Sequence, residues 1–161
     1  MASATISGLS TLGVTFSYAV ETTAGTKPAA FTLLNRCNSI SGIELDTETI
    51  DSSALEDMQS RYVAGRQDTG GDWTVTFNLT PETITELTTM MSAAAAGLAE
   101  TTPKRTWFQV THPDMENAFF VVGQPGSSIP MPDIGQNELL TGDISIAIEE
   151  YKGLSTKVTA S

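Results

Sequence analysis

The sequence predicts a β-rich α+β fold, an antiparallel β-sandwich or barrel with one flanking α-helix. Several short runs alternate apolar with small or polar residues, as half-buried strands do. One segment midway along the chain has helical periodicity, and the strands do not alternate regularly with helices, which argues against a parallel α/β sheet. A length of 161 residues suits one domain, so we expect residues 1–161 to share one core.

The first strand is expected over residues 12–20, after an N-terminal arm formed by residues 1–8. Its apolar residues recur at every second position: Leu12, Val14, Phe16, Tyr18 and Val20. A break at residues 22–28 precedes a second β-compatible run from Phe31 to Leu45, which we expect to bend near Gly42.

Residues 46–72 are rich in acids and hydroxyls and lack a clear period, so we expect a long irregular loop there. A compact domain seldom has so long a connection unless the loop has a function or is disordered. Within it, Leu55, Met58 and Tyr62 are spaced for a short amphipathic turn.

The second half begins with the clearest strand, Trp73 to Leu79, and continues into a helix expected over residues 81–98. Thr80 is suited to cap that helix and Pro81 to be its first residue. The expected buried stripe of the helix consists of Ile84, Leu87, Met91, Ala94 and Leu98.

Two further strands, residues 106–111 and 117–122, are expected to form a hairpin. Glycines and prolines then predict a second loop over residues 123–137. The last strand alternates through Ile144, Ile146 and Ile148, and residues 149–161 are expected to form a C-terminal arm.

Composition excludes several functions. A formal net charge of −11 repels phosphate chains, so tight nucleic-acid binding is not expected. One cysteine allows no intrachain disulfide. Neither a signal peptide nor a run of about 20 apolar residues is visible, so we expect a soluble product of the cytoplasm that does not enter a membrane.

Catalytic, cofactor and metal sites are not expected. His112 reads as a solvated turn residue and Cys37 as a half-buried core residue, and no third motif would orient them as a catalytic pair. Asp46, Glu48 and Asp51 offer oxygen ligands but lack the spacing of a calcium loop. Gly65, Gly70 and Gly71 precede a strand rather than a helix, so they do not form a phosphate loop; we interpret all three as turn residues.

The aromatic residues allow one binding alternative. Trp73, Trp107, Phe119 and Phe120 would form a carbohydrate-binding platform if they were exposed, but aromatic residues on alternating strands usually belong to the core.

A β domain of this kind presents strand edges, which must be paired, covered or charged. If the edge of each subunit meets the opposite edge of a neighbour around a closed cycle, the sheets join into a ring, and the loops are left to bind the next ring. The long loop at residues 46–72 would then have a binding partner.

The order of the motifs resembles that of the major tail tube protein of long-tailed, non-contractile (siphovirus-type) bacteriophages. The similarity covers most of residues 8–148. It rests on the segments "LGVTFSY", "SISGIELDTETID", "YVAGRQDTGGDWTVTFNL", "FQVTHPD" and "GDISIAI". The matching positions are Gly42, Glu44, Asp51, Tyr62, Ala64, Gly65, Asp68, Gly70, Val75, Phe77 and Leu79.

The resemblance implies a tail-tube (Hcp-like) fold and a structural role in the virion tail rather than an enzymatic one. Six subunits would form a ring, and rings would stack into a tube around a tape measure protein, with a tail terminator and distal tail or tip proteins at its ends. Viral DNA would pass through the channel into the host without sequence-specific binding. Assembly would take place in the host cytoplasm.

In the family, the long loop contacts neighbouring subunits and the adjacent ring. Carried onto this chain, the inter-subunit and stacking residues are Glu44, Asp46, Glu48, Asp51, Arg61, Tyr62, Gly65, Arg66 and Asp68. An acidic lining would repel DNA and let it slide. Alternation gives the candidate lumen-facing residues Thr74, Thr76, Asp143, Ser145 and Glu149.

Two alternatives remain open from the sequence. The chain could be the tube subunit of a contractile tail, of a gene-transfer particle or of a type VI secretion-like system, since these share the same physics. It could instead be a carbohydrate-binding β-sandwich module, which would need exposed aromatic residues.

Overall fold

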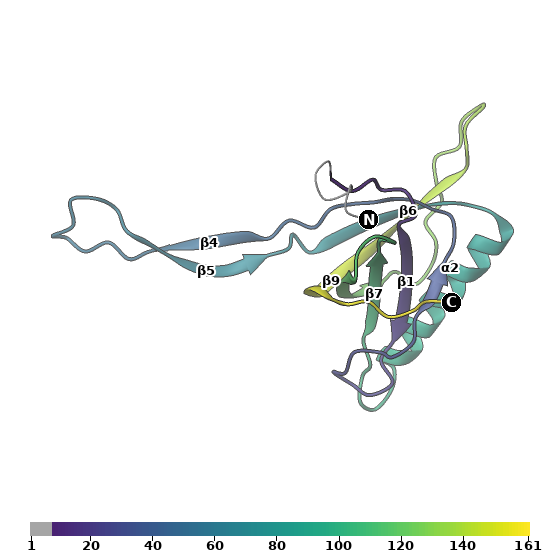
Figure 1. Cartoon of the computed structure of the whole chain (residues 1–161), viewed down its shortest axis with the longest axis horizontal. Coiled ribbons are helices and arrows are strands. Elements are labelled where there is room, and N and C mark those ends of the chain that lie inside the picture. The colour runs from purple at the N-terminus through teal and green to yellow at the C-terminus, as the bar shows by residue number, and fades with distance from the viewer. Residues whose placement is uncertain (1–7) are drawn as a thin grey trace.

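The computed structural model describes residues 8–161, so residues 1–7 of the expected N-terminal arm lie outside the described residues. The described elements, in chain order, are β1 (Thr15–Val20), β2 (Thr32–Leu34), β3 (Cys37–Ile40), β4 (Asp46–Asp51), β5 (Tyr62–Asp68), β6 (Asp72–Asn78), α2 (Pro81–Leu98), β7 (Thr106–Thr111), β8 (Asn117–Pro125) and β9 (Thr141–Thr156). Seven strands form one antiparallel sheet in the order β2-β1-β7-β8-β9-β6-β3, and β4 pairs with β5 in a second sheet. The predicted fold class, mostly antiparallel β-structure with a helix, is confirmed (Figure 1).

The large sheet curls toward a barrel because its two edge strands are consecutive in sequence. Only Asn35 and Arg36 separate β2 from β3, and such a link spans at most about 11 Å, so the two edges must approach each other. Arg36 has a φ of 62°, which breaks the strand direction, and its carbonyl oxygen accepts a hydrogen bond from the Asn78 N–H. The single bent run expected from Phe31 to Leu45 is therefore wrong, because the chain divides at Arg36 and the second strand ends at Ile40.

The main core lies between the sheet and the helix. Phe16 stacks on Phe108 with ring centroids 5.6 Å apart, and Trp73 meets both rings edge-on. The expected alternation in β6 and β9 supplies further buried residues to this cluster: Val75, Phe77, Ile144 and Ile146. The periodicity of the sequence thus predicted which faces of these strands are buried.

Helix α2 has the expected bounds, and the Thr80 side chain caps it by accepting a hydrogen bond from the Thr83 N–H at 3.1 Å. Its buried face differs from the predicted stripe, because Ile84 and Leu98 are exposed. The residues that face the core are Thr83, Leu87, Met90, Met91, Ala94 and Gly97. The stripe is rotated because Gly97 lets the end of the helix approach the chain closely at Lys104.

The region 46–72 is a β-hairpin and not the irregular loop that the sequence predicts. β4 and β5 pair over most of their length, and together they project from the body as a long arm (Figure 1). The pattern was concealed because both faces of the hairpin are exposed, so no apolar alternation marks them. Tyr62 belongs to β5, so the short amphipathic turn expected at Leu55, Met58 and Tyr62 is wrong.

The expected C-terminal arm 149–161 begins as strand, because β9 continues to Thr156 by pairing with β8. Residues 157–161 then cross the second face of the sheet, in front of β7 and β1 in Figure 1. There Val158 and Ala160 pack on a second apolar cluster that includes Phe31, Trp107 and Phe120. Strand β8 and this apolar cluster therefore hold residues 149–161 in place, although the sequence alone does not predict that this segment is ordered.

Two strand ends also differ from expectation. β1 begins at Thr15 and leaves Leu12 exposed, because Gly13 turns the chain with a φ of 85°. β8 continues to Pro125, so the second loop is shorter at its start and runs over residues 126–140. No helix of the described part is long and apolar enough to span a membrane.

Candidate assembly surfaces

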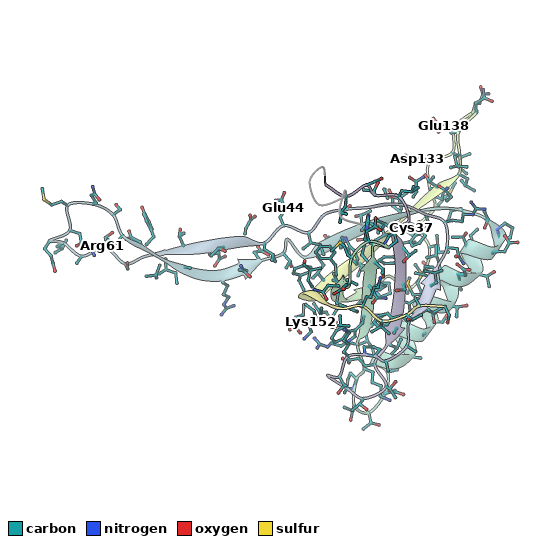
Figure 2. The ribbon with its side chains drawn as sticks, in the orientation of Figure 1. Cys37, Glu44, Arg61, Asp133, Glu138 and Lys152 are labelled. Carbon is teal, nitrogen blue, oxygen red and sulfur yellow. The ribbon has the colours of Figure 1, made fainter. Side chains whose placement is uncertain are left out.

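The hairpin carries the residues predicted to contact other subunits. All of them lie on β4, on β5 or in the segments joined to these strands, and all but the half-buried Gly65 are exposed: Glu44, Asp46, Glu48, Asp51, Arg61, Tyr62, Gly65, Arg66 and Asp68. Figure 2 shows Glu44 where the arm leaves the body and Arg61 near its far end. The structure thus brings the set together on one projecting element.

Gly65 is not a turn residue, as the sequence predicts, but lies within β5 where the register of the hairpin shifts. Thr47 pairs with Gln67 but Thr49 pairs with Ala64, so β5 has an extra residue opposite Glu48. A Cβ atom at Gly65 would lie 3.2 Å from the Glu48 carbonyl oxygen, closer than side chains normally approach. Glycine therefore allows the bulge, which increases the twist of the arm.

The hairpin has little to stabilise it within its own chain. Ile50 and Val63 face each other across the two strands, yet both side chains are about half exposed. Asp46 and Asp68 also lie directly opposite each other, an unfavourable pair of like charges. A two-stranded hairpin is marginal in water by itself. A surface that covers this arm would stabilise it.

The predicted lumen-facing residues of β6 and β9 lie together on the second face of the sheet. Thr74 is paired with Ser145, and Thr76 with Asp143, and the Thr76 hydroxyl donates to the Asp143 carboxylate at 2.6 Å. Their neighbours Val75 and Ile144 point to the core, as the alternation requires. We call these four residues the polar strip: Thr74, Thr76, Asp143 and Ser145.

Glu149 lies apart from the polar strip, because β9 bulges at this point. Ile148 pairs with Gly123 and Glu150 pairs with Val122, so Glu149 has no partner of its own and simple alternation ends there. Its carboxylate lies 4.0 Å from the Arg105 guanidinium, which also contacts Glu150 at 3.4 Å. Part of its negative charge is therefore balanced within the chain.

The segment 157–161 covers the second apolar cluster, and the residue that holds it, Gln109, was not predicted from the sequence. Gln109 is fully buried, donates a hydrogen bond to the Val158 carbonyl at 2.9 Å and accepts one from the Val158 N–H at 2.8 Å. Ser161 adds two backbone hydrogen bonds along the edge of the sheet, one to Phe31 and one to Leu33. The sequence signal for this role was the amide side chain of Gln109 within the largely apolar strand "TWFQVT".

The structure gives Cys37 and His112 separate environments. Burial raises the pKa of the Cys37 thiol to about 11, so the thiol is neutral at pH 7. One ring nitrogen of His112 contacts the Ser10 carbonyl oxygen and the other accepts a hydrogen bond from the Asp114 N–H at 3.0 Å. These contacts fix a turn and do not activate a nucleophile.

Asp46, Glu48 and Asp51 do not converge as ligands, because successive β4 residues alternate between faces and Asp51 points away from the other two. Within residues 8–161, no three His, Cys, Asp or Glu side chains are grouped to hold a metal ion.

The aromatic residues weighed as a carbohydrate platform are mostly core. Trp73, Trp107 and Phe120 are buried, and Phe120 packs on Trp107 with ring centroids 6.3 Å apart. Phe119 is partly exposed. The expectation that this group belongs to the core is confirmed for the three buried rings.

Comparison with known proteins gives structural likeness only. No protein family profile matches the chain, and no curated protein matches its sequence. A chain in the tail of an empty gene transfer agent (GTA) particle, refined with C6 symmetry, matches with a TM-score of 0.53 and 15% identity, covering 90% of this chain and 96% of that one. This likeness shows that the two chains share a fold.

Two further structures superpose less closely. A chain in the virion of a native GTA particle gives a TM-score of 0.47 at 18% identity, covering 80% of this chain and 89% of that one. A chain in the baseplate of the anti-feeding prophage gives 0.41 at 10% identity, covering 90% and 92%. No conclusion is based on these two likenesses.

Proposed function

We propose that this chain is the subunit of a tail tube, in which copies form rings that stack around a channel for DNA. The observation that carries the proposal is the fold, which this chain shares over 90% of its length with a chain of a C6-symmetric tail. A subunit of this kind needs complementary edges, a projecting element that reaches other copies and a face that tolerates DNA.

The sheet edges support side-by-side association. β3, at one end of the sheet, pairs with β6 on one side only, so the other side of this four-residue strand offers its backbone groups. At the other end, residue 161 already pairs beside β2. An unpaired edge such as that of β3 can accept a strand from a neighbouring copy, as a ring of identical subunits would need.

The polar strip supports a channel lining. It presents two threonines, a serine and an aspartate, and the whole chain carries a net charge of −11. Duplex DNA would be repelled from such a wall and would not condense on it, because bound cations are released only when basic groups replace them. Glu149 would lie at the end of this lining, next to Arg105.

The partners follow from the same proposal. Homo-oligomeric rings, six subunits each, would enclose a tape measure protein and end at a tail terminator on one side and at distal tail or tip proteins on the other. The subunit would be found in the particle tail after assembly in the host cytoplasm.

A gene-transfer particle accounts for the structural likeness as well as a non-contractile phage does, because the matched tail is that of a GTA particle. The tube of a contractile tail or of a secretion system remains a third form of the same proposal. All three predict stacked rings and no catalytic activity.

Electron microscopy of the concentrated protein tests the proposal directly. The intact chain should form hollow tubes, whereas a chain with residues 47–67 replaced by a short turn should stay folded by circular dichroism and form no tubes. Persistent monomers under all conditions that favour assembly, including addition of tail tip components, would contradict the proposal.

A further inference from the structure

The tip of the hairpin, residues 52–61, presents apolar side chains to water. Leu55 and Met58 are fully exposed. Next to them, Arg61 is 73% exposed and pairs at 3.3 Å with Asp57, four residues before it. The Asp57 side chain is 17% exposed and keeps the Ala54 N–H as a second partner at 2.8 Å, so the exposed Arg61 could exchange Asp57 for another carboxylate at small cost. The tip therefore offers two apolar groups beside an available cation.

A complementary surface lies on the loop 126–140 and at the start of β9. A pocket of about 320 Å³ has a lining that is more polar than apolar, to which Met131 and Leu139 contribute exposed apolar side chains. Carboxylates of Asp133, Glu138 and Asp143 line the same pocket, and Asp143 already accepts the hydrogen bond from Thr76. Residues 126–143 contain three acids, Asp133, Glu138 and Asp143, and no lysine or arginine, so the charged groups that this stretch contributes are all negative.

The two surfaces match in chemistry. Met131 and Leu139 expose apolar side chains at this pocket, as Leu55 and Met58 do at the tip, and these groups would leave water together. The carboxylates of Asp133 and Glu138 suit the Arg61 guanidinium, which binds carboxylates in a planar fork. The tip also carries Glu56 and Asp57, so the match rests on Arg61 and on the exposed apolar groups.

The two surfaces point in different directions on one chain. In Figure 2, Arg61 lies near the far end of the arm, whereas Asp133 and Glu138 lie on a separate projection at the other side of the body. They cannot meet within a copy. Contact between two different patches of identical chains is head-to-tail, and it repeats from copy to copy.

We propose that the hairpin tip of one copy docks in the 126–140 pocket of another copy, with Leu55 and Met58 in the apolar part and Arg61 on Asp133 and Glu138. The inference rests on the proposed tube function and names the surface that receives the arm.

Two half-defective variants test this contact. The double substitution Leu55→Ser with Met58→Ser removes the apolar groups of the tip and leaves the pocket intact. The double substitution Met131→Ser with Leu139→Ser removes apolar groups of the pocket and leaves the tip intact. All four side chains are exposed, and Met131 and Leu139 line only the open pocket, so both variants should keep the fold. Each variant alone should no longer stack. A one-to-one mixture should form complexes in which one unit of one variant is joined to one unit of the other, and light scattering should report the doubled mass. A mixture that shows no pairing, or a tip variant that still stacks, overturns the contact.

A cross-link distinguishes failure of this contact from failure of the tube proposal. In a Cys37→Ser background, Leu55→Cys in one chain and Leu139→Cys in another should oxidise to a mixed dimer at least about tenfold faster than Leu55→Cys with Leu12→Cys, which is exposed elsewhere. Wild-type tubes with no such preference refute the docking alone. Absence of tubes from wild-type protein refutes the proposed function.

The charges allow a rescue experiment. Glu138→Arg should weaken stacking, and Arg61→Glu in the same chain should restore it, with both effects reduced at high salt. If the double variant stacks no better than Glu138→Arg alone, Arg61 and Glu138 are not in contact and the proposed pose is wrong.

Discussion

Gln109 and Val158 exchange two hydrogen bonds, so a side-chain amide takes the place of a neighbouring strand. The Gln109 amide nitrogen also donates to the Ser17 hydroxyl at 3.1 Å, and both residues lie buried on the second face of the sheet. The segment 157–161 is therefore held by the buried Gln109 side chain, by the Ser161 backbone hydrogen bonds and by the packing of Val158 and Ala160, rather than by a full ladder. Its attachment should respond to a change at Gln109.

Replacing Gln109 by leucine should lower the free energy of unfolding by about 1–3 kcal/mol, because two backbone groups of Val158 lose their partners. Urea unfolding measures this, and amide hydrogen exchange at Val158 should accelerate in the variant. Thr159→Ala, an exposed change in the same segment, is the control and should cost less than about 0.5 kcal/mol. Unchanged protection of Val158 would show that the segment is held by other contacts.

Glu21 gives the chain a predictable sensitivity to acid. Its side chain is 2% exposed and accepts hydrogen bonds from the Arg105 N–H at 2.8 Å and the Trp107 indole at 2.9 Å. Burial raises the pKa of this carboxyl, but these bonds and the Arg105 charge outweigh it and hold the pKa below its ordinary value. The stabilisation is present above the unfolded-state pKa and is lost as the pH falls through the folded-state pKa.

Glu21→Gln should therefore reduce stability at pH 7 and flatten the loss of stability between about pH 5 and pH 3. Urea unfolding across this range measures both effects. Glu116→Gln makes the same chemical change at an exposed site and is the matched comparison. Equal pH slopes for the two variants would mean that Glu21 does not carry the effect.

At Gly97, helix propensity favours alanine whereas packing favours glycine. Alanine is favoured over glycine in a helix by about 1 kcal/mol, but a Cβ here would lie 2.9 Å from the Lys104 carbonyl oxygen and 2.9 Å from Val20 Cγ1. Overpacking against fixed backbone costs about 1–3 kcal/mol. We expect Gly97→Ala to lower the melting temperature, whereas Gly42→Ala, with nothing within 4 Å, should not. A stabilised Gly97 variant would show that the helix end can move away.

Charge on the polar strip tests the channel. Ser145→Lys should still permit tubes but should make them bind duplex DNA in a salt-dependent way and impair DNA delivery by particles built from it. Ser145→Glu, of similar bulk, should leave both properties unchanged. Electron microscopy checks assembly, and DNA retention on sedimented tubes checks binding. If the lysine variant binds no DNA, Ser145 faces elsewhere.

Much of the body could be predicted from the sequence because local pattern and tertiary environment agree there. In β6, every second residue from Trp73 to Phe77 is apolar and buried, and Thr80 with Pro81 marks the start of α2. The helix face was less certain, because a close approach at Gly97 depends on a segment outside the helix.

The hairpin and the chain end could not be predicted in the same way. β4 and β5 bury almost nothing, so their pairing leaves no apolar period, and the segment 157–161 is held by Gln109 from a strand some fifty residues earlier. Glu149 shows the same limit, since a bulge created by pairing with β8 ends the alternation.

The sequence by itself determined the strands that have one buried face, the capped helix, the negative charge and the family resemblance. Each of these can be recognised from residues close together in the chain or from the composition. Only the tertiary structure decided the curl that brings β2 towards β3, the projection of the arm and the placing of residues 157–161. The strand order of the large sheet and the placing of residues 157–161 arise from contacts between segments far apart in the chain, whereas the arm pairs locally but buries too little to leave an apolar pattern.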